Sequence, residues 1–280
     1  MRKELKFVKM HGLGNDYVYI DCFPATAAAT IARTDLSALA RAVSDRHFGI
    51  GSDGLVLILP CKEADAAMRI FNADGSEAEM CGNAIRCVGK YLYERGLCTR
   101  PEMQIKTNSG IRQLRLHVRD GMVHEVTVDM GIPKTATDSL ALKGNDLLGF
   151  TSVNMGNPHA VFFRNWVISD AEMADLGERI GRHPHFPSGT NVEFVHVRNT
   201  RELDVRVWER GSGETMACGT GACAAAVAAY RMGETGENVI VHLKGGELLI
   251  HYNPLENRVA MSGPATEVFR GTYSWEEQSC

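Results

Sequence analysis

Two cysteines occur in similar glycine-rich surroundings, and each precedes a segment with the pattern of a helix. Cys218 lies in the run Met-Ala-Cys-Gly-Thr-Gly, before an alanine-rich stretch that extends to about Arg231. Cys81 lies in Met-Cys-Gly-Asn, before a segment that extends to about Arg95. A thiol at a helix start faces the positive end of the helix dipole and unpaired backbone N–H groups, which favour its thiolate. We therefore predict that both are reactive thiols, although a single such cysteine is more commonly a buried structural residue.

An internal repeat relates these two cysteines to each other. Cys81 and Cys218 are 137 positions apart, and the residues around them correspond at that spacing. Matching positions at this or nearly this spacing are Glu77 and Glu214, Gly82 and Gly219, Asn83 and Thr220, Gly51-Ser-Asp53 and Gly189-Thr-Asn191, and Gly14-Asn15 and Gly156-Asn157. Because the blocks recur in the same order, we predict two related halves.

The repeat and the local patterns predict an α/β (α+β) fold of two pseudo-symmetric halves, residues 1–120 and 121–263. Each half is expected to be a mostly antiparallel sheet curled around the helix after its cysteine, with the active site in the cleft between the halves. The segment after Cys218 is apolar nearly all round, so it must be buried. Other helices are expected at 35–46, capped by Asp35, and from Ser169 to about 180. Strands are expected at 6–21 around a glycine loop, 55–59, 68–71, 103–130, near 153, 160–163, 192–197, 203–208, 239–243, 248–252 and 259–261.

The composition is typical of a cytoplasmic enzyme. A net charge of −4 and a pI near 6.2 argue against a nucleic-acid-binding protein. No apolar run approaches the ~18 residues of a membrane span, and the N-terminal residues do not have the pattern of a signal peptide. Without secretion signals, the eight cysteines are expected to be reduced thiols.

Two thiols on opposite faces of one carbon could remove a proton from one side and return it on the other, which inverts the stereocentre. The α-proton of an amino acid is weakly acidic, so its removal needs electrostatic stabilisation. Backbone N–H groups at the two helix starts, around Gly82-Asn83 and Gly219-Thr220, could supply it to an α-carboxylate. No pyridoxal phosphate or nicotinamide signature is evident, and the cysteine spacing does not suit structural zinc. The predicted chemistry needs no cofactor and no metal.

The chain resembles the diaminopimelate epimerases over nearly its whole length. The similar motifs are Asn72-Ala-Asp-Gly-Ser-Glu77-x-x-x-Cys81-Gly-Asn83, Met155-Gly-Asn157-Pro-His159, Glu209-Arg210-Gly-x-Gly-Glu-Thr-x-Ala-Cys218-Gly-Thr-Gly, His11-Gly-Leu-Gly-Asn15-Asp16 and Arg46-His-x-Gly-Ile-Gly51. The resemblance implies conversion of LL-diaminopimelate to the meso form in lysine and peptidoglycan-precursor synthesis, by a homodimer. It also implies that the C-terminal tail, 264–280, returns to the first half.

The resemblance assigns a role to particular residues of this chain. Cys81 and Cys218 match the two catalytic positions, and His159 and Glu209 match residues that tune the thiols. The implied substrate-binding residues are Asn15, Asn72, Gly82, Asn83, Asn157, Asn191, Glu209, Arg210, Gly219 and Thr220. Arg210 suits a distal carboxylate, because its guanidinium can bind one bidentately. Gly54 departs from members that carry glutamine there, and a glycine cannot make their side-chain contact.

Other readings of the same residues remain open. The scaffold could serve a racemase of another amino acid, of the histidine or hydroxyproline type, or a non-catalytic amino-acid-binding protein. Phenazine-type isomerases share the implied fold but not the cysteine pair, so they are disfavoured. Cys87 and Cys223 are expected in helix cores, and Cys22, Cys61, Cys98 and Cys280 have no predicted role. A disulfide between Cys81 and Cys218 is expected only as an oxidised, inactive form.

Overall fold

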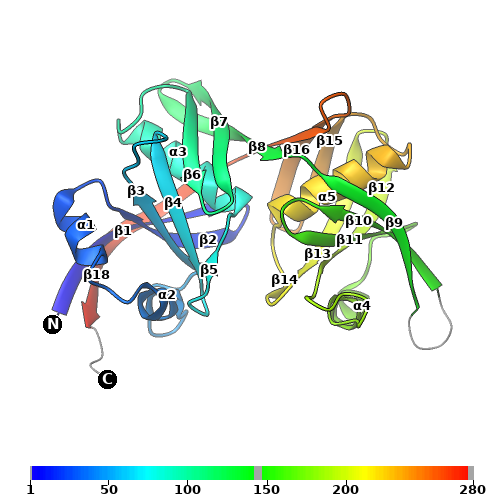
Figure 1. Ribbon diagram of the computed structural model, residues 1–280, viewed down its shortest axis with the longest axis horizontal. Helices are drawn as coiled ribbons and strands as arrows, with labels where there is room; N and C mark the ends of the chain where they lie inside the picture. The colour runs from blue at the N-terminus through cyan, green and yellow to red at the C-terminus, as the bar shows by residue number, and fades with distance from the viewer. Residues whose placement is uncertain (1, 142–146, 277–280) are drawn as a thin grey trace. The chain divides into compact units, whose positions relative to one another are not determined.

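A computed structural model describes residues 2–141 and 147–276 of the chain (Figure 1). The described residues form two compact units. Unit 1 contains the chain up to Val128 together with the residues from Pro264 onward, and unit 2 contains Asp129–Gly263. Cys280 lies outside the described residues.

Unit 1 contains most of the blue and cyan elements of Figure 1. Its elements are β1 (Arg2–Gly12), β2 (Asn15–Asp21), α1 (Ala25–Ile31), α2 (Leu36–Ser44), β3 (Gly54–Leu59), β4 (Ala66–Asn72), β5 (Glu77–Ala78), α3 (Gly82–Glu94), β6 (Glu102–Thr107), β7 (Gly110–Arg119), the first part of β8 (Met122–Gly131) and β18 (Thr266–Glu276). Strands β2 and β3 pair in parallel, as do β4 and β6. The pairs β1–β2, β1–β18, β3–β4, β4–β5, β6–β7 and β7–β8 are antiparallel.

Unit 2 repeats this order of pairings. Its elements are β9 (Lys134–Ala141), β10 (Leu147–Asn154), β11 (Pro158–Arg164), α4 (Asp170–Gly181), β12 (Asn191–Asn199), β13 (Glu202–Glu209), β14 (Gly213–Glu214), α5 (Gly219–Arg231), β15 (Asn238–Leu243), β16 (Gly246–Asn253) and β17 (Arg258–Gly263). Here β11–β12 and β13–β15 are the parallel pairs. The pairs β9–β10, β10–β11, β12–β13, β13–β14, β15–β16 and β16–β17 are antiparallel.

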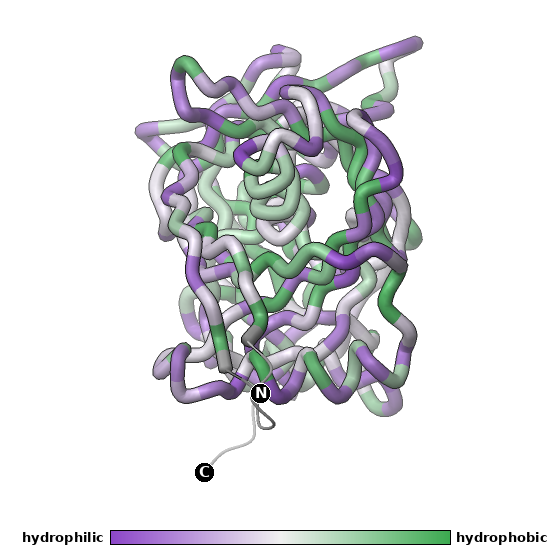
Figure 2. Tube along the Cα trace, turned by 90° about the vertical axis from the view of Figure 1, so that its right-hand side faces the viewer, coloured by the Kyte–Doolittle hydropathy of each residue, from purple (hydrophilic) through white to green (hydrophobic). Residues whose placement is uncertain are grey.

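The helix that follows each cysteine is buried within its own unit. Helix α5 contacts strands β10 to β13 and β15 to β17, and Figure 2 shows a helix encircled by strands in this unit. Its run of small side chains, Ala222 to Ala229, is buried throughout, so strands can pack against every face. Helix α3 contacts β1, β2, β6 and β7. The prediction of a mixed α/β fold, rich in strands that are mostly antiparallel, is therefore confirmed.

The two other helices predicted with caps also form where the sequence places them. The Asp35 side chain accepts a hydrogen bond from Ala38 N at the start of α2. Ser169 and Glu172 form a capping box at the start of α4.

The sequence did not predict strands β9 and β18. Strand β18 buries only Trp275, so its sequence lacks the alternation of a half-buried strand, and its long antiparallel pairing with β1 supplies its structure instead.

The chain passes from unit 1 to unit 2 within strand β8. The turn at 120–121, which the sequence suggested as the boundary, joins β7 to β8 instead. Val126 and Val128 pair with β7 and are buried, so this part of β8 belongs to unit 1. None of the described helices is long and apolar enough to cross a membrane.

The capping box of α4 supplies a first testable prediction. Replacing Ser169 by Ala should lower the free energy of unfolding by about 1 kcal/mol, because the Glu172 N–H loses its acceptor. Denaturant unfolding measures the change. Asp175→Asn is the control, since it removes only an exposed ion pair with Arg179 and should cost less than about 0.5 kcal/mol. Equal losses in the two variants would contradict the role of the cap.

Candidate active site

Cys81 and Cys218 both occupy the N-cap position of a helix. Cys81 has the extended backbone of an N-cap, and its carbonyl accepts the first helical hydrogen bond from Ile85 N. Cys218 does the same with Ala222 N at the start of α5. Neither helix carries an acidic residue in its first turn. The backbone N–H groups of both helix starts are therefore free of a competing carboxylate from their own first turn.

In unit 1, the side chain of Asn15 lies beside Cys81. The Cys81 thiol donates to Asn15 Oδ1 at 3.4 Å, and Asn83 Nδ2 donates to the same oxygen at 3.2 Å. The Tyr17 hydroxyl donates to Cys81 Sγ at 3.9 Å. Three predicted residues, Asn15, Cys81 and Asn83, are thus brought together. Tyr17 was missed by sequence reasoning, although its place directly after the Asn15-Asp16 motif was the available signal.

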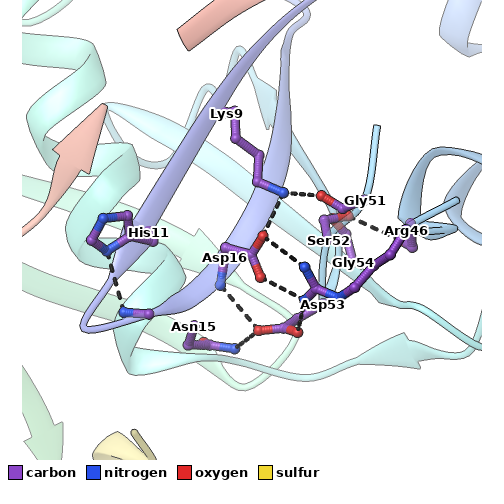
Figure 3. Close-up of polar contacts among 11 residues, drawn as sticks. Lys9, His11, Asn15, Asp16, Arg46, Gly51, Ser52, Asp53 and Gly54 are labelled. Atoms are coloured by element: carbon purple, nitrogen blue, oxygen red, sulfur yellow. Dashed lines mark hydrogen bonds and ion pairs between the residues drawn. The ribbon is translucent and has the colours of Figure 1, made fainter. Parts of the chain in front are cut away.

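Asp53 fixes the direction of the Asn15 amide (Figure 3). Asp53 Oδ2 accepts hydrogen bonds from Asn15 Nδ2 at 2.8 Å and from the Asp16 backbone N at 3.0 Å. A carboxylate can only accept when ionised, so the NH2 group of Asn15 must face Asp53 and its oxygen must face Cys81.

A network of charges supports this arrangement (Figure 3). Arg46 bridges Asp16 at 2.9 Å and Asp53 at 2.8 Å, and the buried ammonium of Lys9 pairs with Asp16 and donates to a backbone carbonyl. Burial would raise the pKa of Asp16, but hydrogen bonds from Arg46 and Lys9 outweigh it and lower that pKa. Burial and the charge of Asp16 raise the pKa of Asp53.

In unit 2, Cys218 is more deeply buried than Cys81, with 5% of its surface exposed. Burial raises the pKa of its thiol well above the ordinary value, and the carboxylates of Glu209 and Glu193 raise it further. The expectation that the helix start would favour the thiolate is therefore wrong for Cys218, because burial and two nearby carboxylates outweigh the helix dipole. The Cys218 thiol is close enough to Glu209 to donate to its carboxylate, which also accepts from the Thr215 hydroxyl at 2.5 Å.

His159 connects to Cys218 through two of the predicted residues. His159 Nε2 lies 3.0 Å from Asn157 Oδ1, Asn157 Nδ2 donates to Thr220 Oγ1 at 3.3 Å, and Thr220 Oγ1 lies 3.5 Å from Cys218 Sγ. The other ring nitrogen of His159 lies 2.6 Å from Glu193 Oε1, with both side chains fully buried. Sequence reasoning missed Glu193, although a carboxylate within a strand of buried residues was the available signal.

The remaining predicted residues lie apart from these contacts. Asn191 is buried and bonds to backbone, donating to Pro158 O and accepting from Arg210 N. The Arg210 guanidinium is exposed and donates to Ser188 O at 3.1 Å. In unit 1, the Asn72 amide donates to Ser76 Oγ at 3.0 Å.

A cavity of about 420 Å³ lies beside Glu209 and Arg210. It is also lined by Trp208, by Thr190, by Glu178 and Gly181 of α4, and by Arg182, which follows α4. Such a space could hold a small polar ligand group next to the Arg210 cation. Gly54, in unit 1, has no room for a side chain without a shift of the backbone, because a Cβ there would lie 2.1 Å from Phe71 O.

Gly82 and Gly219, the first residues of α3 and α5, are buried beside their cysteines. Cys87 and Cys223 lie within the buried helices as expected, and burial raises the pKa of Cys87 to about 11. Burial likewise raises the pKa of Cys22 to about 12.

Comparison with known proteins identifies related sequences and folds. The family model for diaminopimelate epimerase matches residues 7–136 and 151–268. The chain is 48% identical to the diaminopimelate epimerase of Moorella thermoacetica, over 96% of this chain and 99% of that one. It is 45% identical to that of Methanococcus maripaludis, over 95% and 99%. A solved hydroxyproline epimerase from Agrobacterium vitis shares the fold, with a TM-score of 0.74 and 16% identity over 99% of this chain and 95% of that one. A PhzF-family phenazine biosynthesis protein from Bacillus anthracis does so at a TM-score of 0.71 and 15% identity, over 98% and 100%.

The charge network of unit 1 predicts that replacing Asp16 and replacing Arg46 will have unequal effects on stability. Asp16→Asn should lower the free energy of unfolding by about 3 kcal/mol, because it leaves the buried Lys9 ammonium without a carboxylate. Arg46→Gln, the control, removes a half-exposed cation from the same carboxylate and should cost less than about 1 kcal/mol. Denaturant unfolding at pH 7 compares them. A larger loss for Arg46→Gln would show that Lys9 does not depend on Asp16.

The surroundings of Cys218 predict the direction in which its reactivity changes. Glu209→Gln removes a negative charge that raises the pKa of the thiol, so that pKa should fall and the thiolate fraction should rise. Alkylation of Cys218 by iodoacetamide at pH 8, followed by peptide mass spectrometry, should accelerate roughly three- to tenfold. Cys81 is the reference within the same molecules and should keep its rate. An unchanged or slower rate at Cys218 would contradict this account.

Proposed function

We propose that this chain, which belongs to the diaminopimelate epimerase family, inverts the α-carbon of diaminopimelate with Cys81 and Cys218 as its two acid–base groups. The observation that carries the proposal is that both cysteines of the matched motifs form the N-cap of a buried helix. One thiolate removes the α-proton from one face, and the other thiol returns a proton to the opposite face. The proposal requires both thiols to reach the same α-carbon.

The two helix starts supply the electrostatic part of this chemistry. Removal of the α-proton leaves negative charge that spreads onto the α-carboxylate. Backbone N–H groups at Gly82-Asn83 and Gly219-Thr220 are suited to stabilise that charge, since they lie at the positive ends of α3 and α5. The thiols and backbone dipoles account for the proton transfer, so the proposed reaction uses no cofactor.

The contacts of Cys218 suit a group that works in both protonation states. The Glu209 carboxylate can accept a hydrogen bond from the thiol form of Cys218. The Thr220 hydroxyl, 3.5 Å away, can donate to the thiolate form. A group with both partners can act as an acid in one direction of the reaction and as a base in the other.

Substrate binding is proposed for the polar residues around the two thiols. Asn15, Asn72, Asn157 and Asn191 are proposed to hold the polar groups of the substrate. Arg210, beside the cavity, would bind the distal carboxylate, and Glu209 would lie near the distal ammonium. Diaminopimelate has a second amino-acid head group, which histidine and hydroxyproline lack. Because Arg210 and the asparagines could bind this second group, they favour diaminopimelate as the substrate. We further propose a cytoplasmic homodimer that acts in lysine and peptidoglycan-precursor synthesis, on the basis of the family alone.

The exchange of the α-hydrogen with solvent tests the proposed function. Purified protein with LL-diaminopimelate in D2O, without added cofactor, should form the meso isomer and incorporate deuterium at the α-carbon. Cys81→Ala and Cys218→Ala should each lose about 10²- to 10⁴-fold in epimerisation, because each removes one acid–base group. Cys61→Ala is the control, since Cys61 lies outside both motifs.

The outcomes separate the alternative functions. Full turnover in either catalytic variant would overturn the two-base mechanism. Exchange with histidine or 4-hydroxyproline but not with diaminopimelate would identify a different racemase. Tight binding of diaminopimelate by the wild-type protein without any exchange would indicate a binding protein.

A further inference from the structure

We propose that Glu193 is a positioning residue for Cys218, which it reaches through a hydrogen-bond relay of His159, Asn157 and Thr220. Nothing in the proposed function uses Glu193. The inference deepens that function and rests on it only for the role of Cys218 as an acid–base group.

The relay is continuous within unit 2. It runs from Glu193 Oε1 to His159 Nδ1 (2.6 Å), from His159 Nε2 to Asn157 Oδ1 (3.0 Å), from Asn157 Nδ2 to Thr220 Oγ1 (3.3 Å) and from Thr220 Oγ1 to Cys218 Sγ (3.5 Å). Its first two members are fully buried. Water therefore cannot replace either partner at that end.

The direction of each hydrogen bond follows from the Asn157 amide. Its NH2 group donates to Thr220 Oγ1, so its oxygen faces His159 and must accept a proton from Nε2. The Thr220 oxygen already accepts from Asn157, which leaves the hydroxyl proton free to donate to Cys218 Sγ. In this direction the relay ends in a donor that supports the thiolate.

Glu193 is the group that keeps His159 in the required state. With Nε2 donating to Asn157, an ionised Glu193 would require Nδ1 to donate as well. The Glu193 carboxylate lies against the first turn of α5, where a Cβ on Gly221 would come within 2.8 Å of Oε1. The helix dipole therefore favours its charge. Its other oxygen, Oε2, is buried and has no hydrogen-bond partner among the described residues.

A neutral His159 would allow the relay to reverse. With its proton on Nδ1, the ring would offer a lone pair at Nε2, and the Asn157 amide could turn to donate to it. The Thr220 hydroxyl would then donate to Asn157 Oδ1, and its oxygen could only accept from Cys218. The reversed relay supports the thiol, so the charge of Glu193 selects the direction that supports the thiolate.

The proposed effect opposes the direct Coulomb effect of the same carboxylate. The carboxylates of Glu209 and Glu193 act on the Cys218 thiol through space, and both raise its pKa. Glu209 in turn interacts with His159 and Glu193. Loss of either negative charge would, by Coulomb's law alone, favour the thiolate. Only Glu193 also orients the relay. Comparing Glu193→Gln with Glu209→Gln therefore separates the orientation of the relay from the through-space effect of a carboxylate charge.

Site-specific alkylation of Cys218 tests the inference without any substrate. Glu193→Gln should slow iodoacetamide alkylation of Cys218 at pH 8 roughly tenfold relative to Cys81, because the thiolate loses an oriented donor. Glu209→Gln removes the same charge outside the relay and should accelerate alkylation. If both variants accelerate it, or if Glu193→Gln leaves the rate unchanged, the relay is refuted. If Glu193→Gln does not fold, Glu193→Asp takes its place and should slow alkylation of Cys218 by an intermediate factor. A wild-type rate in Glu193→Asp would equally refute the relay.

A double-mutant cycle checks that Glu193 acts through Thr220. Thr220→Val removes the final donor and should slow alkylation of Cys218 by a similar factor. The double variant Glu193→Gln/Thr220→Val should be no slower than Thr220→Val, because both changes interrupt one relay. Multiplied effects would indicate independent, structural roles. The alkylation assay needs no substrate, so it can refute the relay while the wild-type protein still exchanges the α-hydrogen of diaminopimelate. It can equally support the relay in a protein that does not exchange this hydrogen.

Discussion

The burial of ionisable groups at the start of α5 is the constraint on which unit 2 depends. A thiol, two carboxylates and an imidazole lie near one another there, and Cys218, His159 and Glu193 have almost no exposed surface. Burial opposes charge on each of them, so each must find a partner within the protein. The hydrogen bonds of His159 with Glu193 and Asn157 provide those partners, and the adjoining helix end favours the carboxylate.

The two cysteines share a backbone geometry but differ in their surroundings. Cys81 is half-buried and has neutral neighbours, the Asn15 amide and the Tyr17 hydroxyl, with charges held one step away at Asp53. Cys218 is buried beside two carboxylates that disfavour its thiolate. The proposed reaction needs one thiol and one thiolate at the same time, and the carboxylates beside Cys218 favour its thiol form.

The buried helices explain how such groups can be held in place. Strands contact α5 on all sides, and its alanine side chains have no rotamer freedom and occupy little space, so the strands approach closely. At Gly221 even a methyl group would collide with Glu193. The first turn of the helix and the strand residues opposite it therefore have fixed relative positions. Glu193, His159 and Thr220 therefore stand on regular elements, and Asn157 lies in the short turn that joins β10 to β11.

The sequence alone determined the repeat, the fold class and the residues of both motifs, because these depend on local spacing. Glycines mark the turns, the capping residues Asp35 and Ser169 mark helix starts, and an all-apolar segment after Cys218 has to be buried. Strand β18 could not be predicted, since its stability comes from pairing with β1 at the other end of the chain.

Tertiary structure alone decided the electrostatics of the thiols. The helix start, read by itself, favoured a thiolate at Cys218. Folding brings Glu193 and Glu209, from other strands, against the same thiol and removes water from it. Proton affinity depends on every charge and on the solvent within several ångströms, and the order of residues along the chain does not specify that environment.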